Sequence, residues 1–314
     1  MPARLRLRSL AKINLDLRVL NKRPDGYHEL RSIFQTISLA DVIDVQYQPG
    51  RTRIDIKSNV NITDNLIVRA ADSVMKVTRR TGRLGFVLQK RIPIGGGLGG
   101  GSSNAAAILL ALPLLLGKPL PTEKLMELGA ALGSDVPFFL LGGTAVGLGR
   151  GTELYPLPDV QPRPALLIAP GIHVSTKEAY AQLGRELTSD SARSIDRFQS
   201  TAWRIADSSP DEGVNDFERV VFHQHPQLKS IKGKLLKLGA RPALMSGSGS
   251  SLFGIFPSRQ LRDLAVESFR KDFTESKVFS VTMVSRSRYR ALWRRQLAAP
   301  MDSKVWPPQD RYAR

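Results

Sequence analysis

Hydrophobic and polar residues alternate along the first part of the chain. From residue 5 to residue 19 almost every odd position is apolar, and a period of two predicts a β-strand. The even positions then place Lys12, Asn14 and Asp16 together on the opposite face of this strand, pointing away from the core. Residues 21–26 read N-K-R-P-D-G, which is a turn composition, so the chain is expected to reverse direction there.

The pattern after this turn predicts strands followed by helices. A long apolar run predicts a buried helix that begins at 102–104, and Pro113 should kink or end it. Capping residues at 61–64 precede another apolar stripe, and Gly133 ends the last helix of this region. Strands are expected at 32–39, 42–47, 53–56 and 86–94, and helices at 65–80, 103–116 and 122–132.

A proline-dense segment at 155–164 predicts a domain boundary. It separates an N-terminal domain, 1–155, from a C-terminal domain, 165–285, and leaves a basic tail, 286–314. The C-terminal domain reads as an α+β module. Strands are expected at 165–169, 243–246, 252–256 and 278–284, and helices at 215–223, 226–238 and 259–271.

Two further segments of this half differ in how clearly they are patterned. Ser175 and Glu178 have the spacing of a capping box, which predicts a helix that runs to residue 183. Residues 186–212 are polar and weakly patterned, although Trp203 and Ile205 suggest some packing.

The basic tail allows two interpretations. Trp293 and Leu297 have helical spacing, so a short amphipathic helix packed on the body is one possibility and a disordered segment another. An arm that binds nucleic acid is the alternative. We expect the packed or disordered tail, with catalysis carried by the preceding domains, so that truncation after Val284 leaves activity largely intact.

Composition narrows the class of protein. A chain of 314 residues is long enough for two domains. It has no cysteine, which excludes disulfides, thiolate metal sites and a cysteine nucleophile, and which fits a cytoplasmic protein. The N-terminus has no secretory pattern, and the most apolar run, 108–116, is too short to span a bilayer, so a soluble protein without membrane contact is expected.

The net charge of +18 is the unusual feature of the composition. Such a charge suits nucleic acid, an anionic membrane or a phosphorylated substrate. The basic residues are spread along the chain and no aromatic and basic RNA-binding pattern accompanies them. We therefore expect a solvated basic surface that attracts small phosphorylated substrates, and no nucleic-acid partner.

The glycine-rich segment 93–106 carries the clearest chemical signal. It reads P-I-G-G-G-L-G-G-G-S-S-N-A-A and connects a predicted strand to a predicted helix. Glycine permits positive φ and close approach to a ligand, and a helix N-terminus directs N–H groups and positive dipole toward the same point. This combination predicts a phosphate site. A Walker A loop is excluded because no G-K-[ST] follows, and a linker would be polar on both sides.

Together with five other segments, the glycine-rich segment resembles the GHMP kinases. The others are A-K-I-N-L at 11–15, D-G-Y-H-E-L at 25–30, N-L-I-V-R-A at 65–70, G-S-D-V-P-F-F at 133–139 and S-G-S-G-S-S-L-F at 246–253. The resemblance extends from Ala11 to about Val284. It implies a two-domain α+β fold, with an N-terminal domain like ribosomal protein S5 and a ferredoxin-like C-terminal domain.

The resemblance also implies a reaction. The two glycine triplets and D-G-Y-H resemble family members that transfer phosphate from ATP to the 2-hydroxyl of 4-diphosphocytidyl-2-C-methyl-D-erythritol, in the non-mevalonate isoprenoid pathway. ATP and Mg²⁺ would be the cofactors, and the enzyme would be a monomer or homodimer. The alternatives are a GHMP kinase for mevalonate, homoserine or a sugar, and a catalytically silent RNA-binding protein.

The resemblance implies a catalytic pair, Lys12 and Asp135. Asp135 would accept the proton of the attacking hydroxyl, while Lys12 would keep that carboxylate ionised and stabilise developing negative charge. Taken from the residues alone, Lys12 could be a surface lysine and Asp135 a helix N-cap.

Two further groups of residues are implied by the resemblance. Tyr27, His28 and Asn14 would recognise cytosine, and Tyr180 would close over the base unless it is a core tyrosine. Ser102 or Ser103 could hold Mg²⁺, while the sequence has no metal-ligand cluster. The residues around ATP would be Asn65 (alternatively a helix cap), Leu66, Lys90, Pro93, Ile94, Gly95, Gly96, Gly97, Leu98, Gly99, Gly100, Gly101, Ser102 and Ser103, with 246–251 facing this loop.

Overall fold

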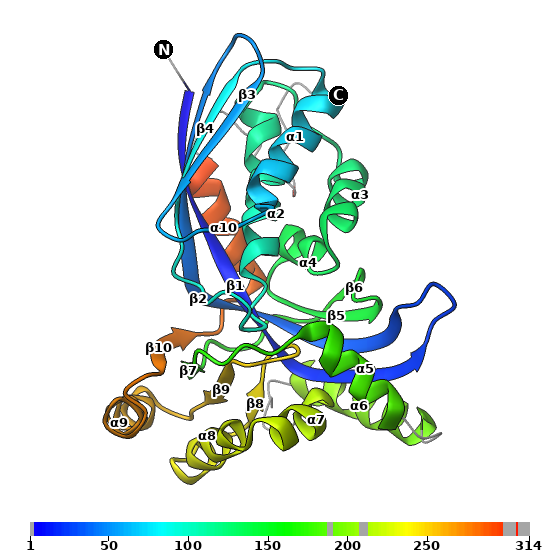
Figure 1. Ribbon diagram of the computed structural model, residues 1–314, viewed down its shortest axis with the longest axis vertical. Helices are drawn as coiled ribbons and strands as arrows, with labels where there is room; N and C mark the ends of the chain where they lie inside the picture. The colour runs from blue at the N-terminus through cyan, green and yellow to red at the C-terminus, as the bar shows by residue number, and fades with distance from the viewer. Residues whose placement is uncertain (1–2, 187–190, 207–212, 298–305, 307–314) are drawn as a thin grey trace.

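Two long antiparallel strands, β1 (Ala3–Lys22) and β2 (His28–Gln48), run through both halves of the molecule (Figure 1). The computed structural model describes residues 3–186, 191–206, 213–297 and 306. One continuous β2 corrects the prediction of separate strands at 32–39 and 42–47. Asp41 lies in the gap between those two predicted strands, where it is fully buried and pairs with Ser9 of β1 in the ladder.

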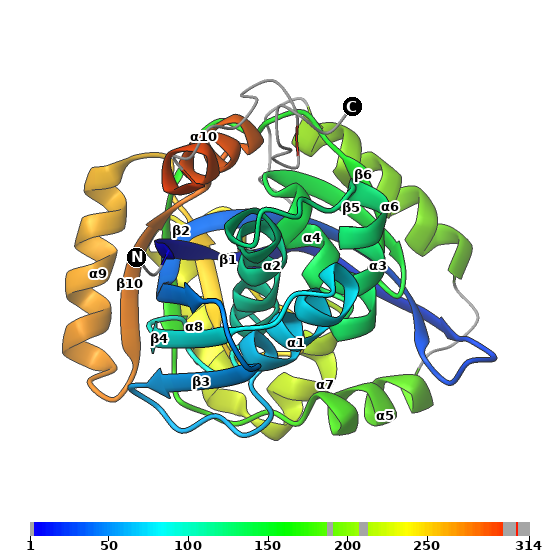
Figure 2. The same ribbon diagram turned by 90° about the horizontal axis from the view of Figure 1, so that it is seen from above.

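The first sheet contains six strands within the described residues. Its order is β3 (Arg53–Ser58), β4 (Arg83–Gln89), β2, β5 (Thr144–Gly149) and β6 (Glu153–Pro156), and β1 pairs with the other edge of β2. Helices α1 (Leu66–Thr78), α2 (Gly100–Leu115), α3 (Thr122–Leu132) and α4 (Val136–Leu141) pack together beside this sheet (Figures 1 and 2).

Helix α2 lies at the centre of the first hydrophobic core. Every residue from 103 to 113 is buried, as expected for a helix that is apolar on all sides. The helix begins at Gly100, earlier than predicted, because Gly99 takes the left-handed conformation with φ of +66° at the N-cap. Pro113 lies in the last turn and the helix ends at Leu115, so the chain stops being helical two residues after the proline.

Both faces of β1 are buried from Ser9 to Leu20, which corrects the expectation that its polar face points away from the core. Lys12, Asn14 and Asp16 are each at most 3% exposed. The glycine-rich segment and the second half of the chain cover this face. The Lys12 backbone N–H donates to the Leu98 carbonyl at 3.0 Å, and the Val214 backbone N–H donates to the Asp16 carboxylate at 3.1 Å.

The second sheet has the strand order β10 (Lys277–Thr282), β7 (Pro164–Ala169), β9 (Leu252–Ile255) and β8 (Ala243–Met245). In chain order this arrangement is 4-1-3-2, all antiparallel, as in the predicted ferredoxin-like domain. Helices α7 (Phe217–Gln224) and α8 (Pro226–Lys237) lie below β8 and β9 in Figure 1, and α9 (Arg259–Asp272) lies beside β10.

Two helices connect β7 to α7. The first, α5 (Thr176–Glu186), begins where predicted, and the Glu178 backbone N–H donates to the Ser175 hydroxyl at 3.3 Å, as in a capping box. The second, α6 (Ser191–Ala206), falls in the segment read as weakly patterned. Phe198 is its buried anchor, whereas Trp203 is 72% exposed, so the packing expected of Trp203 was wrong. The side chain of Ile205 lies outside the described residues.

The first residues of the predicted tail form a helix, α10 (Arg286–Leu297), which lies beside β1 (Figure 2). Tyr289, Trp293 and Leu297 are at most 2% exposed and join the same core as α2. The remaining residues of the tail, apart from Trp306, lie outside the described residues. Within the described parts of the chain, no helix is both long enough and apolar enough to cross a membrane.

Candidate active site

The glycine-rich segment forms a tight loop between β4 and α2. Gly95, Gly97 and Gly99 have φ values of +69°, +73° and +66°, which L side chains rarely adopt. Gly97 also lies against the second glycine- and serine-rich turn: a Cβ added there would be 1.9 Å from the carbonyl oxygen of Ser246. The loop therefore needs glycine at Gly97 for two independent reasons, backbone conformation and space.

Hydrogen bonds join the loop to the turn at 246–251, which faces it as expected. The Ser246 hydroxyl donates to the Gly97 carbonyl at 2.9 Å, and the Ser251 backbone N–H donates to the Gly96 carbonyl at 3.3 Å. The Gly247 backbone N–H donates to the side-chain oxygen of Asn14 at 2.9 Å. Asn14 thus connects the strand β1 with a turn that belongs to the second sheet.

Lys12 and Asp135 lie together where β1 meets the start of α4. The Lys12 Nζ is 3.5 Å from the Asp135 Oδ2 and donates to the Asn14 Oδ1 at 2.8 Å. The Lys12 side chain is only 4% exposed, which excludes a surface lysine. Asp135 occupies the N-cap position of α4, but its carboxylate caps no backbone N–H of that helix. Its side chain is 35% exposed and is therefore open to a ligand.

A cleft of about 950 Å³ contains this pair and is lined by both halves of the chain. Half of the twenty predicted site residues lie on its wall, which also includes His173 and Thr176. The predicted residues that line it are Lys12, Asn14, Tyr27, His28, Gly95, Gly97, Gly99, Ser102, Asp135 and Tyr180.

Ten predicted residues around ATP are not on the wall of the cleft. Six of them belong to the glycine-rich segment whose other residues line it: Pro93, Ile94, Gly96, Leu98, Gly100 and Gly101. The remaining four lie elsewhere. Asn65 lines a smaller hollow of about 350 Å³, and its side chain also caps α1 by accepting from the Ile67 backbone N–H at 3.0 Å. Leu66 lies beside Gly101: a Cβ added at Gly101 would be 3.5 Å from the Leu66 Cδ1. Ser103 is buried, and its hydroxyl donates to the Leu10 carbonyl at 2.6 Å.

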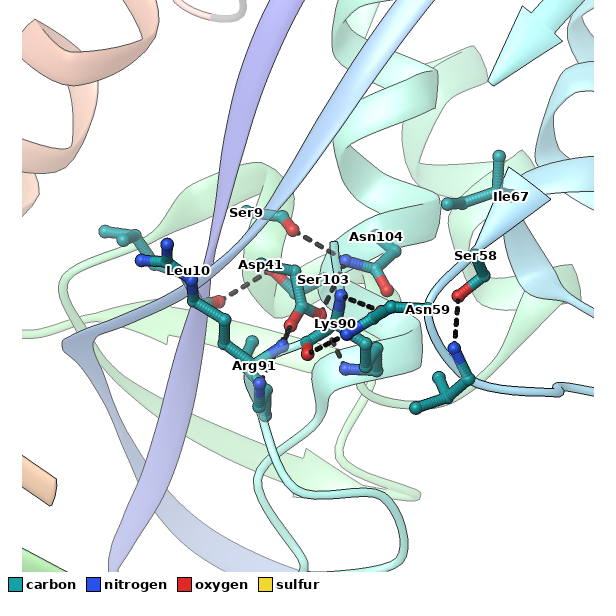
Figure 3. Close-up of polar contacts among 12 residues, drawn as sticks. Ser9, Leu10, Asp41, Ser58, Asn59, Ile67, Lys90, Arg91, Ser103 and Asn104 are labelled. Atoms are coloured by element: carbon teal, nitrogen blue, oxygen red, sulfur yellow. Dashed lines mark hydrogen bonds and ion pairs between the residues drawn. The ribbon is translucent and has the colours of Figure 1, made fainter. Parts of the chain in front are cut away.

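The fourth, Lys90, points into the protein and not into the cleft (Figure 3). Its Nζ lies 2.5 Å from the Asp41 carboxylate, and both side chains are at most 6% exposed. Burial lowers the pKa of Lys90, and the charge of Asp41 opposes this shift.

Asp41 accepts hydrogen bonds from three further groups around the base of the loop (Figure 3). These are the backbone N–H groups of Arg91 at 2.7 Å and Ile92 at 2.8 Å, and the side chain of Asn104 at 3.0 Å. The carboxylate therefore connects the start of the glycine loop to the first turns of α2.

The residues described by the structure contain no group of three or more potential metal ligands. Of the two serines considered for Mg²⁺, Ser102 lines the cleft, whereas Ser103 is occupied by the Leu10 carbonyl. Only the Ser102 hydroxyl is available for a phosphate-bound cation.

Aromatic rings form the end of the cleft that lies away from the glycine loop. The rings of His28 and Tyr180 stack with centroids 5.1 Å apart, and Tyr180 meets Phe217 edge-on at 4.7 Å. His28 and Tyr180 are in direct contact, so no base fits between those two rings in this conformation. Tyr27 is 51% exposed at the mouth.

Burial sets the charge of two of these groups. It lowers the pKa of His28, with the nearby Lys22 adding to the effect, so the imidazole is neutral at pH 7. Burial also raises the pKa of Tyr180, which therefore stays a neutral phenol.

Sequence reasoning missed many residues of the cleft wall, among them Ser32, Phe34, Arg150 and Phe217. Ser32 accepts a hydrogen bond from the Asn14 side chain at 2.7 Å, and the ring of Phe34 lies 5.5 Å from the Lys12 Nζ. Arg150 carried the one usable signal, a charged residue between two glycines.

Comparison with known proteins identifies the family. The model described as GHMP kinases N terminal domain matches residues 65–143, and the model described as GHMP kinases C terminal matches residues 203–275. A crystal structure of 4-(cytidine 5'-diphospho)-2C-methyl-D-erythritol kinase matches with a TM-score of 0.75 at 35% identity, over 89% of this chain and 99% of that one. A homoserine kinase structure from Cytophaga hutchinsonii, at 19% identity and a TM-score of 0.68 over 90% of this chain and 95% of its own, shares the fold.

Proteins similar in sequence identify the family more narrowly than the domain models do. The 4-diphosphocytidyl-2-C-methyl-D-erythritol kinase of Solibacter usitatus (strain Ellin6076) is 54% identical over 315 residues, 98% of this chain and 97% of that protein. A protein of the same name from Citrifermentans bemidjiense is 42% identical over 258 residues, 81% of this chain and 90% of its own. The predicted two-domain α+β kinase fold is confirmed. The chain belongs to the GHMP kinases and, within them, to the family of the 4-diphosphocytidyl-2-C-methyl-D-erythritol kinases.

Proposed function

We propose that this enzyme transfers the γ-phosphate of ATP to the 2-hydroxyl of 4-diphosphocytidyl-2-C-methyl-D-erythritol, in the non-mevalonate pathway to isoprenoid precursors. The observation that carries the proposal is the place of the Lys12–Asp135 pair. It lies in one cleft with the glycine loop and with an aromatic pocket suited to a nucleobase. Phosphoryl transfer needs little more than such positioning and charge stabilisation.

Asp135 is the general base in this proposal. Its partly exposed carboxylate can reach the 2-hydroxyl and accept its proton as the oxygen attacks phosphorus. The buried ammonium of Lys12, held by Asn14, lies 3.5 Å from this carboxylate and stabilises negative charge on the transferred group.

ATP binds at the glycine loop in this proposal. The N–H groups of the first turn of α2 and its positive dipole end face the phosphates. Asn65 and Leu66 border the adenosine half, and Lys90 supports the loop from below through Asp41. Mg²⁺ would arrive on the phosphate oxygens and neutralise their charge, with the Ser102 hydroxyl as the protein group facing it.

Cytosine binds at the aromatic end of the cleft. Tyr27 and Tyr180 provide ring faces, while the neutral His28 offers one donor and one acceptor to the edge of the base. Asn14 lies between this pocket and the loop. A neutral imidazole suits a neutral base, because neither partner brings an uncompensated charge into the pocket.

The test is ADP release with different acceptors. We expect turnover with ATP and 4-diphosphocytidyl-2-C-methyl-D-erythritol, and at most background ADP release with ATP alone, with mevalonate or with homoserine. The product should carry one new phosphate on the 2-oxygen by ³¹P NMR. Turnover with mevalonate or homoserine, without turnover of the nucleotide-linked acceptor, would overturn the proposal.

A further inference from the structure

The turn between β5 and β6 brings a cation into the cleft that the proposed reaction does not yet use. Arg150 lies between Gly149 and Gly151, whose φ values are +65° and +86°. The Arg150 side chain lines the cleft, and its Cζ lies 3.6 Å from the centroid of the Tyr27 ring. At this distance the guanidinium contacts one face of the ring, so the other face remains for a base.

Two contacts fix the position of this turn. The Gly149 backbone N–H donates to one oxygen of Glu29 at 3.2 Å, and the other oxygen pairs with Arg23 at 2.5 Å. The turn is thereby joined to the segment that carries Tyr27. Gly151 lies against Phe34, whose ring is 3.5 Å from where a Cβ at Gly151 would be.

Arg150 consequently lies between the two ends of the cleft. On one side is Tyr27, at the aromatic end. On the other is Phe34, whose ring is 5.5 Å from the Nζ of the catalytic Lys12. In the proposed acceptor the diphosphate stands between the nucleoside and the carbon chain that bears the 2-hydroxyl. The covalent order of the substrate and the order of these residues therefore agree.

The guanidinium is also available to a ligand. Among the described residues no ion pair holds Arg150, and its Nε is buried without a hydrogen-bond partner. Lys12, by contrast, is already held by Asn14 and Asp135. Lys22 and Lys177 also line the cleft, but within the described residues neither ammonium lies over an aromatic ring. A planar guanidinium can stack with its face and still donate from its edge, which an ammonium cannot do.

We propose that Arg150 binds the diphosphate of the nucleotide-linked substrate, with its face on Tyr27 and its N–H edge on the phosphate oxygens. The inference rests on the proposed function. It makes Arg150 a substrate-binding residue that couples recognition of the base to placement of the acceptor hydroxyl. A free nucleoside does not use this contact, whereas a nucleoside diphosphate does.

The test compares cytidine, CMP and CDP by calorimetry with the full chain and two variants, Arg150→Gln and Arg150→Lys. We expect Arg150→Gln to weaken CDP by ~10- to 100-fold, the range of a lost charged hydrogen-bond pair, and to change cytidine by less than about 2-fold. The CDP affinity of Arg150→Lys should lie between those of the unaltered enzyme and Arg150→Gln, because lysine keeps the positive charge but lacks the paired N–H donors of the guanidinium. Arg53→Gln, at an exposed arginine paired only with Asp55, is the control for charge and should leave all three affinities unchanged.

The outcomes separate the alternatives. Equal losses for cytidine and CDP would show that Arg150 only supports the Tyr27 ring, and no loss of CDP affinity would show that it contacts no phosphate. Either result overturns the proposal. Failure of the unaltered enzyme to bind cytidine or CDP would overturn the proposed function as well. With the complete acceptor, Arg150→Gln should raise KM for that substrate while KM for ATP stays constant.

Discussion

Single residues carry the chemistry of this cleft, and burial changes what each of them can do. A lysine 4% exposed beside a carboxylate 35% exposed differs from a surface ion pair, because the cation loses little of its field to solvent. Asn14 accepts from both the Lys12 ammonium and the Gly247 backbone N–H, so it fixes the ammonium relative to the second sheet. The pair is therefore held in place before any substrate arrives.

The first prediction concerns Asp135. Replacing it with asparagine removes the proton acceptor but keeps the shape of the side chain, so kcat should fall by at least ~10²-fold. Substrate affinities should change little, because Asp135 caps no N–H of α4 and so is not needed for that helix. Steady-state kinetics would test this, with Asp72→Asn at an exposed position of α1 as control. Near-normal turnover of Asp135→Asn would disprove the role of base.

The second prediction concerns His28. Its pKa lies below the ordinary value of about 6.5, so the ring is neutral at pH 7 and becomes a cation only as pH falls through that lowered pKa. KM for the nucleotide-linked substrate should be flat between pH 7 and 8 and should rise in acid. His28→Ala should raise this KM at pH 7, leave KM for ATP nearly unchanged and abolish the acid dependence. Equal changes for both substrates would show that the segment is structural.

The positions of residues in the cleft were predictable where a short sequence pattern carried them, and not where contacts are long-range. Lys12, Asp135, Tyr27 and His28 could be proposed from local sequence and do line one cleft. The burial of the Lys90 side chain could not be predicted in this way, because its partner Asp41 is 49 positions away in the chain, on β2. A lysine beside a glycine loop looks like a phosphate ligand until its buried carboxylate is known.

At the scale of elements, the two facing loops form the junction between the halves of the molecule. Gly96 and Gly97 accept hydrogen bonds from Ser251 and Ser246. The glycine loop is thus shaped by the second sheet as well as by its own glycines. Each loop is short and is held at both ends by a strand or helix. A shift of the backbone in one loop therefore moves the other through the hydrogen bonds that join them.

The third prediction follows for Gly97→Ala. A methyl group there would be 1.9 Å from the Ser246 carbonyl oxygen at a φ of +73°, so the loops must separate. We expect KM for ATP to rise by at least ~10-fold and the free energy of unfolding to fall by more than the ~1–3 kcal/mol of backbone strain alone. Gly117→Ala is the matched control, since its φ is +63° and nothing lies within 4 Å. Equal effects of the two variants would show that the contact between the loops is unimportant.

Element prediction succeeded where periodicity and stop signals agreed. The helix predicted at 122–132 has those bounds in the structure, as α3, because Gly133 ends it. The continuous strand β2 and the helix α6 were missed for opposite reasons. Asp41 is a polar residue buried inside a strand, and α6 has a polar surface anchored by few apolar residues. Both depend on tertiary partners that local pattern does not contain.

At the scale of the whole molecule, the last described helix completes the first core. The Tyr289 ring lies where a Cβ of Gly142 would be, and the Tyr289 hydroxyl donates to the Phe139 carbonyl at 2.5 Å. The Trp306 indole donates to the Leu140 carbonyl at 2.8 Å. These three partners lie in or just after α4, the helix that follows Asp135. We propose that domains 1–155 and 165–285 enclose the cleft and that α10 belongs with the first.

This packing changes the expectation for truncation after Val284. Removing α10 would expose the cavity now filled by Tyr289, Trp293 and Leu297 and would release α4. The sequence alone favoured an expendable tail, because it lies beyond the segments that resemble the GHMP kinases and its arginines have no acidic neighbours except Asp302 and Asp310. We now expect the truncated chain to be strongly destabilised and to lose turnover, since Asp135 is positioned by the element that loses its support.

The final prediction isolates this effect in one residue. Trp293 is 1% exposed in the core, and Trp203 on α6 is 72% exposed. Trp293→Ala should lower the free energy of unfolding by ~3–5 kcal/mol through the cavity it leaves, whereas Trp203→Ala should stay within about 0.5 kcal/mol of the unaltered chain. Urea unfolding measures both. In the Trp293 variant that remains folded, kcat should fall more than either KM rises, because α10 acts through α4 on Asp135, the proposed base, and not on a substrate. A variant with unchanged stability and turnover would show that α10 is no part of the working core.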